Sequence, residues 1–98
     1  SIPLGTAKMS YFVYLIISKK NSKILSYVGY SNNLAKRIEL HNKGKGAKFT
    51  RGRKWKLIYK KKYNSKHTAM VEEYKLKKNY KLRNLIKLNY QKKFNNNI

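Results

Sequence analysis

Acidic residues are scarce in this sequence, and cysteine is absent. Three glutamates are the only acids among 98 residues, against 25 lysines and arginines, which gives a formal net charge of +22. Without cysteine, disulfide bonds, cysteine-ligated zinc and thiol nucleophiles are excluded. Three carboxylates also exclude a metal site built from several acidic side chains, of the kind that two-metal nucleases use.

Long apolar runs are missing as well. No stretch approaches the roughly 20 apolar residues that a membrane-spanning helix needs, and the first residues lack the apolar segment of about 7–15 residues typical of a signal peptide. We therefore expect an intracellular protein of the cytoplasm and nucleoid, or of the nucleus if the host is eukaryotic or viral, with no membrane partner. Electrostatic attraction of the basic chain to a membrane surface is the alternative.

Positive charge is what the chain has in excess. Such a chain repels itself, and a polyanion relieves that repulsion. Basic side chains also bind phosphate backbones by releasing counterions. Lysine supplies 21 of the 25 basic residues, so the composition of an AT-rich genome is an alternative explanation. Because such a bias adds lysine but does not remove aspartate, the charge favours nucleic-acid binding.

The length predicts one domain, and 41% hydrophobic residues suffice for a core. We expect the domain to span residues 9–93. Residues 1–8 are small and nearly uncharged and precede Met9 directly, so we interpret them as a cloning remnant. Residues 94–98 are expected to form a frayed tail.

Hydrophobic periodicity predicts a small α/β (α+β) domain of order β-β-α-β-α-α. Residues 11–18 and 24–30 are predicted to form an antiparallel hairpin with a turn around Asn21. A helix over 33–42 is expected to be capped by Ser31 or Asn32 and ended by Gly44. A basic loop at 45–54 and a third strand at 55–63 follow.

Two helices complete the predicted domain. The first runs over 66–78, is capped by Asn64 or Ser65, and has an inward face formed by Ala69, Met70, Glu73, Leu76 and Lys77. The last covers about 80–92, with an inward face formed by Leu82, Leu85, Ile86 and Asn89.

The placement of the three acids matters most for chemistry. Glu39 and Glu72 point away from the apolar stripes of their helices, whereas Glu73 lies on the stripe between Ala69 and Leu76. A carboxylate facing a core needs a partner or a metal ion. The pattern leaves a metal ligand and an ion pair with a nearby lysine equally open.

Arg37 and His41 share one helix face, because they stand at positions i and i+4. An arginine in a lysine-dominated chain suggests bidentate binding of a phosphate. The alternative is a surface arginine and a histidine near the helix C-terminus, where a cation is favourable.

Tyrosines and a glycine-containing loop are further candidates. Tyr14 and Tyr27 lie on the paired strands and are expected to be neighbours, although a phenol of pKa about 10 is a poor base at neutral pH. The loop at 44–54 combines cations with Phe49, which suits phosphate binding and base stacking. A flexible, solvated loop is the alternative.

Together these positions resemble the GIY-YIG nuclease superfamily. Six elements match in order: Phe12-Val13-Tyr14, Tyr27-Val28-Gly29, Arg37, His41, the segment Gly46-Ala47-Lys48-Phe49-Thr50-Arg51-Gly52-Arg53, and Ala69-Glu73-Lys77. The resemblance covers Tyr11 to Asn79 and is greatest to small stand-alone members and to the catalytic subunit of the branched-DNA nuclease. The first motif lacks its Gly and Ile, and Tyr30 stands where excision-repair members carry Lys. About 12 residues separate the two motifs, consistent with a slightly long hairpin turn.

The resemblance implies a DNA endonuclease that uses one divalent cation, Mg²⁺ or Mn²⁺. Glu73 would bind the metal, Arg37 would neutralise the phosphate, and Tyr14 or Tyr27 would act on the attacking water with help from His41. Tyr27 is slightly favoured because it borders Gly29 and the helix of Arg37. We expect DNA contacts from Tyr30, Lys45, Lys48, Phe49, Arg51, Arg53 and Lys77.

Three other functions fit parts of the pattern. A binding module that no longer cuts would keep the charge, although all expected site residues are present. An enzyme that needs a protein partner to recognise branched or damaged DNA would explain the absence of a further domain. A ribosomal or other RNA-binding structural protein fits the charge but gives no reason for Glu73 to face inward.

Overall fold

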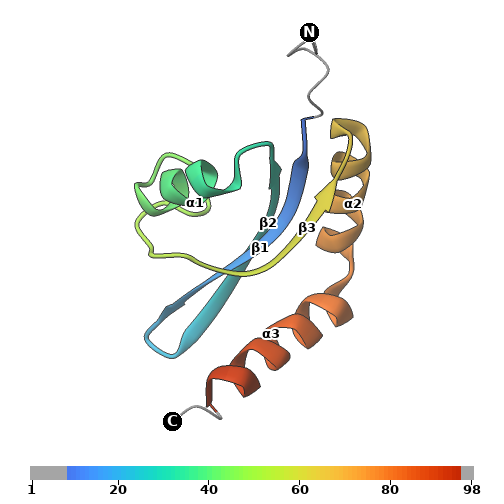
Figure 1. Cartoon of the computed structure of the whole chain (residues 1–98). Coiled ribbons are helices and arrows are strands. Elements are labelled where there is room, and N and C mark those ends of the chain that lie inside the picture. The colour runs from blue at the N-terminus through green and yellow to red at the C-terminus, as the bar shows by residue number, and fades with distance from the viewer. Residues whose placement is uncertain (1–8, 96–98) are drawn as a thin grey trace, which may run out of the picture.

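The computed structural model describes residues 9–95, so the expectations for residues 1–8 and 96–98 lie outside it. Within this range, no helix combines the length and the apolar character that a membrane crossing requires. Six elements follow one another in the predicted order (Figure 1): β1 (Tyr11–Lys20), β2 (Lys23–Ser31), α1 (Leu34–Asn42), β3 (Lys56–Tyr63), α2 (Lys66–Lys78) and α3 (Tyr80–Asn95). The predicted fold class is confirmed.

The three strands form one antiparallel sheet of order β2-β1-β3. β1 is therefore the central strand, and β2 and β3 are both edges. In the β1–β2 register, Tyr14 faces Gly29 and Ile16 faces Tyr27. The β1–β3 pairing shifts by one residue between Leu15 and Ile16. Tyr14 and Tyr27 are thus diagonal neighbours across the hairpin, as the sequence predicts.

Helices cover both faces of the sheet, which explains why β1 is apolar along most of its length. On one face, Val13, Leu15 and Val28 pack with Ala69 and Leu76 of α2. The opposite face carries a second core of Tyr14, Ile16 and Trp55, packed against Leu34 and Ile38 of α1. Figure 1 shows α1 and α2 on opposite sides of the strands.

The hairpin turn is shorter than predicted. Lys20 pairs with Lys23, so only Asn21 and Ser22 form the turn, and both have positive φ values, 53° and 68°. The expected long turn is wrong because the residues between the two motifs extend the strands instead. The hairpin therefore projects beyond the rest of the sheet (Figure 1).

The helix ends follow simple capping chemistry, with one correction. The N-cap of α1 is Asn33, whose side chain accepts from the Lys36 N–H, and not Ser31 or Asn32. Ser31 still belongs to β2, and its hydroxyl bonds both backbone groups of Asn33. α1 ends at Asn42, and Gly44, with a φ of 78°, follows its C-cap and terminates it as predicted. Ser65, one of the two predicted caps, caps α2.

Parts of the predicted inward faces of α2 and α3 are exposed. Met70, Leu82 and Leu85 are all exposed, although each was predicted to face inward. Met70 lies about 100° around the helix from Ala69 and so leaves the stripe that Ala69 and Leu76 define. α3 leaves α2 at an angle (Figure 1), so that Ile86 packs on the sheet core while Leu82 and Leu85 do not. α3 also extends to Asn95, three residues past its expected end.

Candidate active site

A hydrogen bond between Tyr14 and His41 forms the centre of the site. Tyr14 lies on the central strand β1 and His41 in the last turn of α1, and both are almost completely buried, with 1% and 0% exposure. The Tyr14 Oη and His41 Nε2 atoms are 2.7 Å apart. A buried polar pair of this kind is stable only when each group finds a partner.

Thr50 supplies the second partner of the His41 ring. Its Oγ1 lies 2.9 Å from His41 Nδ1 and 3.0 Å from the Ala47 carbonyl oxygen. The threonine hydroxyl has one proton, which it donates to that carbonyl, so it must accept from His41 Nδ1–H. In a neutral ring Nε2 is then free to accept the Tyr14 hydroxyl proton. The network therefore fixes the tautomer of His41.

The ionisation of this pair follows from its burial. Burial lowers the pKa of His41 below 6.5, and the nearby Arg37 charge lowers it further. Burial raises the pKa of Tyr14 well above its usual value, with smaller contributions from Tyr27 and Glu73 that Arg37 partly opposes. Both groups are consequently neutral at physiological pH. These effects also place Tyr27, Arg37 and Glu73 within electrostatic range of one phenol.

Two glycines make room for these buried rings. A Cβ on Gly29, opposite Tyr14 in the register, would overlap the Tyr14 hydroxyl. A Cβ on Gly46 would overlap the His41 ring at Nδ1. Any side chain at either position would displace the tyrosine or the histidine.

Tyr27 and Phe49 form the more open side of the site. The Tyr27 ring lies edge-on to His41 at 5.1 Å and is stacked with Phe49 at 6.2 Å and 20°. Phe49 is 53% exposed and also contacts Trp55. Tyr27 is half-buried, so it stands between the buried Tyr14–His41 pair and the surface.

Glu73 projects from α2 beside the sheet and is 17% exposed at its side chain. Its Oε2 is 3.4 Å from the Lys77 amine, which is the lysine ion pair that the sequence leaves open. The other predicted partner, a metal ion, stays a prediction. Glu39 and Glu72 are instead paired with Lys43 and Lys75. Within residues 9–95, no group of three or more acidic or histidine side chains could hold a metal ion together. Glu73 fits a site with a single carboxylate and several waters.

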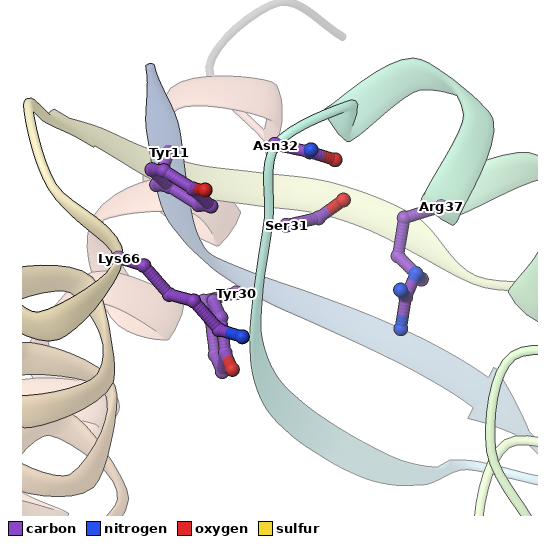
Figure 2. A pocket seen from close by; sticks show the side chains of 6 residues that line it. All are labelled: Tyr11, Tyr30, Ser31, Asn32, Arg37 and Lys66. Atoms are coloured by element: carbon purple, nitrogen blue, oxygen red, sulfur yellow. The ribbon is translucent and has the colours of Figure 1, made fainter. Parts of the chain in front are cut away.

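The predicted DNA-contacting residues lie in several different parts of the structure. Lys45, Lys48 and Arg51 are exposed in the loop after α1, and Lys77 has its amine near Glu73. Tyr30 lines a pocket with Arg37 (Figure 2). Arg53 differs from these residues because its Nε donates to Ser18 Oγ at 3.2 Å and its second terminal nitrogen is buried without a hydrogen-bond partner.

The loop that carries these cations is anchored at its centre. Thr50 is fully buried, and the Trp55 indole N–H donates to the Thr50 carbonyl at 2.8 Å. Asn42 bonds the Trp55 backbone N–H and carbonyl with its side-chain amide. The alternative of a flexible loop, free of the core, is therefore wrong for the segment around Thr50.

Sequence reasoning missed Thr50 and Lys66 as site residues. Thr50 was part of the matched loop segment but was not singled out, because its contact with His41 spans nine residues and follows no helical or strand period. Lys66 is one of 21 lysines, and only its place beside Arg37 and Tyr30 distinguishes it.

In this small α+β domain, a tyrosine, an arginine, a histidine and a glutamate thus lie within hydrogen-bonding or electrostatic range of the Tyr14 phenol. The family model of the GIY-YIG catalytic domain matches residues 10–89, and the chain belongs to this family. This confirms the resemblance seen in the sequence and gives the chain a nuclease-type fold.

Within that family, the chain is similar to small bacterial proteins named UPF0213. It is 44% identical over 68 residues to one from Oceanobacillus iheyensis, covering 68% of this chain and 76% of that protein. It is 41% identical over 93 residues to one from Clostridium perfringens, covering 86% and 97%. A UPF0213 protein from Bacillus halodurans, solved by NMR, is 37% identical with a TM-score of 0.45 over 82% of this chain and 85% of its own.

These names state no activity, substrate or metal. The similarity to the catalytic subunit of the branched-DNA nuclease therefore stays a prediction. So do cleavage itself and the roles of individual site residues.

Proposed function

We propose that this protein is a divalent-metal-dependent DNA endonuclease that hydrolyses phosphodiester bonds, acting on branched or damaged DNA in repair or recombination. One observation carries the proposal: the Tyr14 phenol is hydrogen-bonded to His41 and lies within electrostatic range of Tyr27, Arg37 and Glu73. A basic protein that only coats nucleic acid needs no such convergence around a buried, neutral histidine.

Glu73 would hold Mg²⁺ or Mn²⁺, since it is the glutamate that lies within electrostatic range of the Tyr14 phenol. Such an ion supplies Lewis-acid stabilisation of charge on the phosphate and on the leaving oxygen. Lys77 must yield its place near the carboxylate when the site is loaded. Its amine, half-exposed and 3.4 Å from Glu73, can turn to the DNA backbone instead.

Arg37 is the cation that stabilises the phosphate in the transition state. Within residues 9–95 its side chain forms no ion pair with a carboxylate, and its charge influences both Tyr14 and His41. The planar guanidinium matches two phosphate oxygens at once. Charge placed beforehand where negative charge develops lowers the barrier without reorganisation.

Tyr27 is the tyrosine that orients the attacking water and, as the phenolate, accepts its proton. Tyr14 is 1% exposed and its hydroxyl proton is committed to His41, so it cannot meet water in this arrangement. Tyr27 is half-buried, lies against the His41 ring and lines a surface pocket with Lys77. The hydrogen-bonded network of Tyr14, His41 and Thr50 positions Tyr27 through the contact between the His41 and Tyr27 rings.

The test is cleavage of a labelled panel of duplex, single-stranded, flap and four-way-junction DNA. We expect cutting with Mg²⁺ or Mn²⁺ and none with excess EDTA, with the branched substrates cut fastest. Equal cutting of all shapes would remove the structure preference and leave the endonuclease. Binding of every substrate with no cutting under any condition would contradict the enzyme itself.

The second candidate is a nucleic-acid-binding accessory module that does not cut, or that cuts only with a protein partner. The Lys77–Glu73 ion pair favours it, because a paired carboxylate has a structural role without metal. Adding a candidate partner to the same panel separates the two versions. Restored cutting indicates a partner-dependent enzyme, and continued binding without cutting indicates the module.

A further inference from the structure

A pocket of about 340 Å³ opens where β2 ends, close to the candidate active site. Its volume is near the lower limit of ligand pockets, about 300–1,000 Å³, which suits one small group. Figure 2 shows the Lys66 and Arg37 side chains on either side of the last residues of β2. The lining consists of Tyr11, Tyr30, Ser31, Asn32, Arg37 and Lys66, which include two cations and no carboxylate.

Two hydrogen-bond donors of this pocket converge on a poor acceptor. The Tyr11 hydroxyl and the Asn32 amide both donate to the sulfur of Met9, at 3.4 and 3.3 Å. A thioether sulfur accepts hydrogen bonds weakly, and Met9 is exposed. An anionic oxygen placed near this sulfur would be a much better acceptor for both donors.

The two cations of the pocket lack a negative partner. All three glutamates of the chain are paired with other lysines, namely Lys43, Lys75 and Lys77. Among residues 9–95, neither Arg37 nor Lys66 forms an ion pair with a carboxylate. Two uncompensated cations beside two poorly used donors favour a bound anion.

Arg37 joins the pocket to the site, because it lines the pocket and also acts on Tyr14 and His41. Lys66 and Glu73 stand seven residues apart on one face of α2, about 10 Å along the helix axis. We propose that this pocket binds the phosphate next to the scissile phosphate, with Lys66 as its main cation and Arg37 between the two phosphates. The nature of the ligand rests on the proposed function.

A direct test compares two ligands that differ by one charge. The first is a thymidine trinucleotide with two phosphodiesters, and the second has one phosphodiester replaced by an uncharged methylphosphonate. Binding to the intact chain is followed in EDTA by NMR titration of the Ser31 and Asn32 amides. We expect the doubly charged ligand to bind about tenfold more tightly, the effect of one charge-assisted hydrogen bond.

Lys66→Met tests which residue senses the second charge, because it keeps most of the stem and removes the amine. We expect the tenfold ratio to fall below about twofold in this variant. Lys92→Met, which removes an exposed charge near the far end of α3, should keep the ratio. An undiminished ratio in Lys66→Met would overturn the proposal.

The same samples distinguish failure of the pocket from failure of the enzyme. If wild-type protein cuts DNA but the ratio is indifferent to Lys66, the pocket proposal is wrong and the nuclease proposal stands. If the ratio depends on Lys66 but no DNA is cut, the phosphate pocket stands on a binding module.

Discussion

Thr50 sets the tautomer of His41 although its own side chain is fully buried. Its hydroxyl donates to the Ala47 carbonyl and so must accept from His41 Nδ1, which leaves Nε2 for the Tyr14 hydroxyl. Thr50 is therefore a positioning residue for His41. The same geometry is out of reach if Gly46 carries a side chain, because its Cβ would overlap the ring.

Replacing Thr50 by valine should therefore allow the His41 ring proton to occupy either Nδ1 or Nε2. We expect Thr50→Val to lower the cleavage rate at least tenfold with little change in DNA affinity, because the proton is no longer held at Nδ1. Stability should fall by about 1–3 kcal/mol, since His41 loses a buried partner. Thr50→Ser keeps the hydroxyl and should retain most activity.

The decisive readout is the ¹⁵N NMR spectrum of His41, which distinguishes the two neutral tautomers. Wild type and Thr50→Ser should carry the proton on Nδ1, and Thr50→Val should show a mixture. An unchanged tautomer in Thr50→Val would contradict the positioning role, whatever its activity.

At the residue scale, the positions of several side chains follow from the sequence, while their roles in the site stay predictions. The apolar stripe of α2 predicts an inward Glu73 that needs a partner, and the Glu73 side chain is 17% exposed and lies beside Lys77. Arg37 and His41 were picked for their shared helix face, and both act on Tyr14. Thr50 and Lys66 were missed because contacts across loops have no period. Only the folded chain brings them to His41 and Arg37.

The turn of the β1–β2 hairpin contains a backbone conformation that is sterically unfavourable for a non-glycine residue. Ser22 has a φ of 68°, a left-handed conformation that costs an ordinary L-residue about 1–2 kcal/mol relative to glycine. Two-residue turns with positive φ at both positions favour Asn-Gly, and Asn21 already supplies the first of these residues.

Ser22→Gly should stabilise the protein by about 1 kcal/mol, measured by urea unfolding. Cutting should not change, because the turn begins seven residues after Tyr14 along β1, roughly 23 Å away. Ser22→Ala is the matched control and should bring no gain, since alanine meets the same steric conflict. A glycine variant no more stable than the alanine variant would show that the turn holds no such cost.

Element order was predictable because each element has a clear local signal. Runs of aromatic and β-branched residues marked β1 and β2, and Ser65 marked the start of α2. The exposed faces of α2 and α3 were not predictable from period alone. Leu82 and Leu85 fit the apolar pattern, but the angle between α2 and α3 leaves both exposed, whereas Met70 is exposed because it lies off the stripe of Ala69 and Leu76.

For the molecule as a whole, pH should alter stability through one histidine. The folded-state pKa of His41 lies below 6.5, so the unfolded chain binds more protons as the pH falls below that value. The free energy of unfolding should therefore decrease below about pH 6.5, by at most about 1.4 kcal/mol per pH unit.

His67 provides the control for this effect, because it is the other histidine and is exposed on α2. His67→Gln should keep the pH dependence of unfolding between pH 7.5 and 5.5. His41→Gln should flatten it, whatever its effect on stability at pH 7.5. Parallel curves for wild type and His41→Gln would contradict a buried, neutral His41.

The charge of +22 and the single inward carboxylate together define the account of this protein. The charge favours binding to DNA, and by itself would suit many nucleic-acid-binding proteins. Glu73 favours an enzyme over a protein that only binds nucleic acid, because a carboxylate repels the phosphate backbone unless a metal ion lies between them.

The most direct test measures cutting and binding together for wild type, Glu73→Gln and the neighbouring control Glu72→Gln. With Mg²⁺ present, we expect Glu73→Gln to lose cutting by at least about a hundredfold, to bind DNA with unchanged affinity, and to unfold at the same temperature. Glu72→Gln should cut like wild type. Equal cutting by Glu73→Gln and wild type would contradict the metal-dependent nuclease proposed for this site.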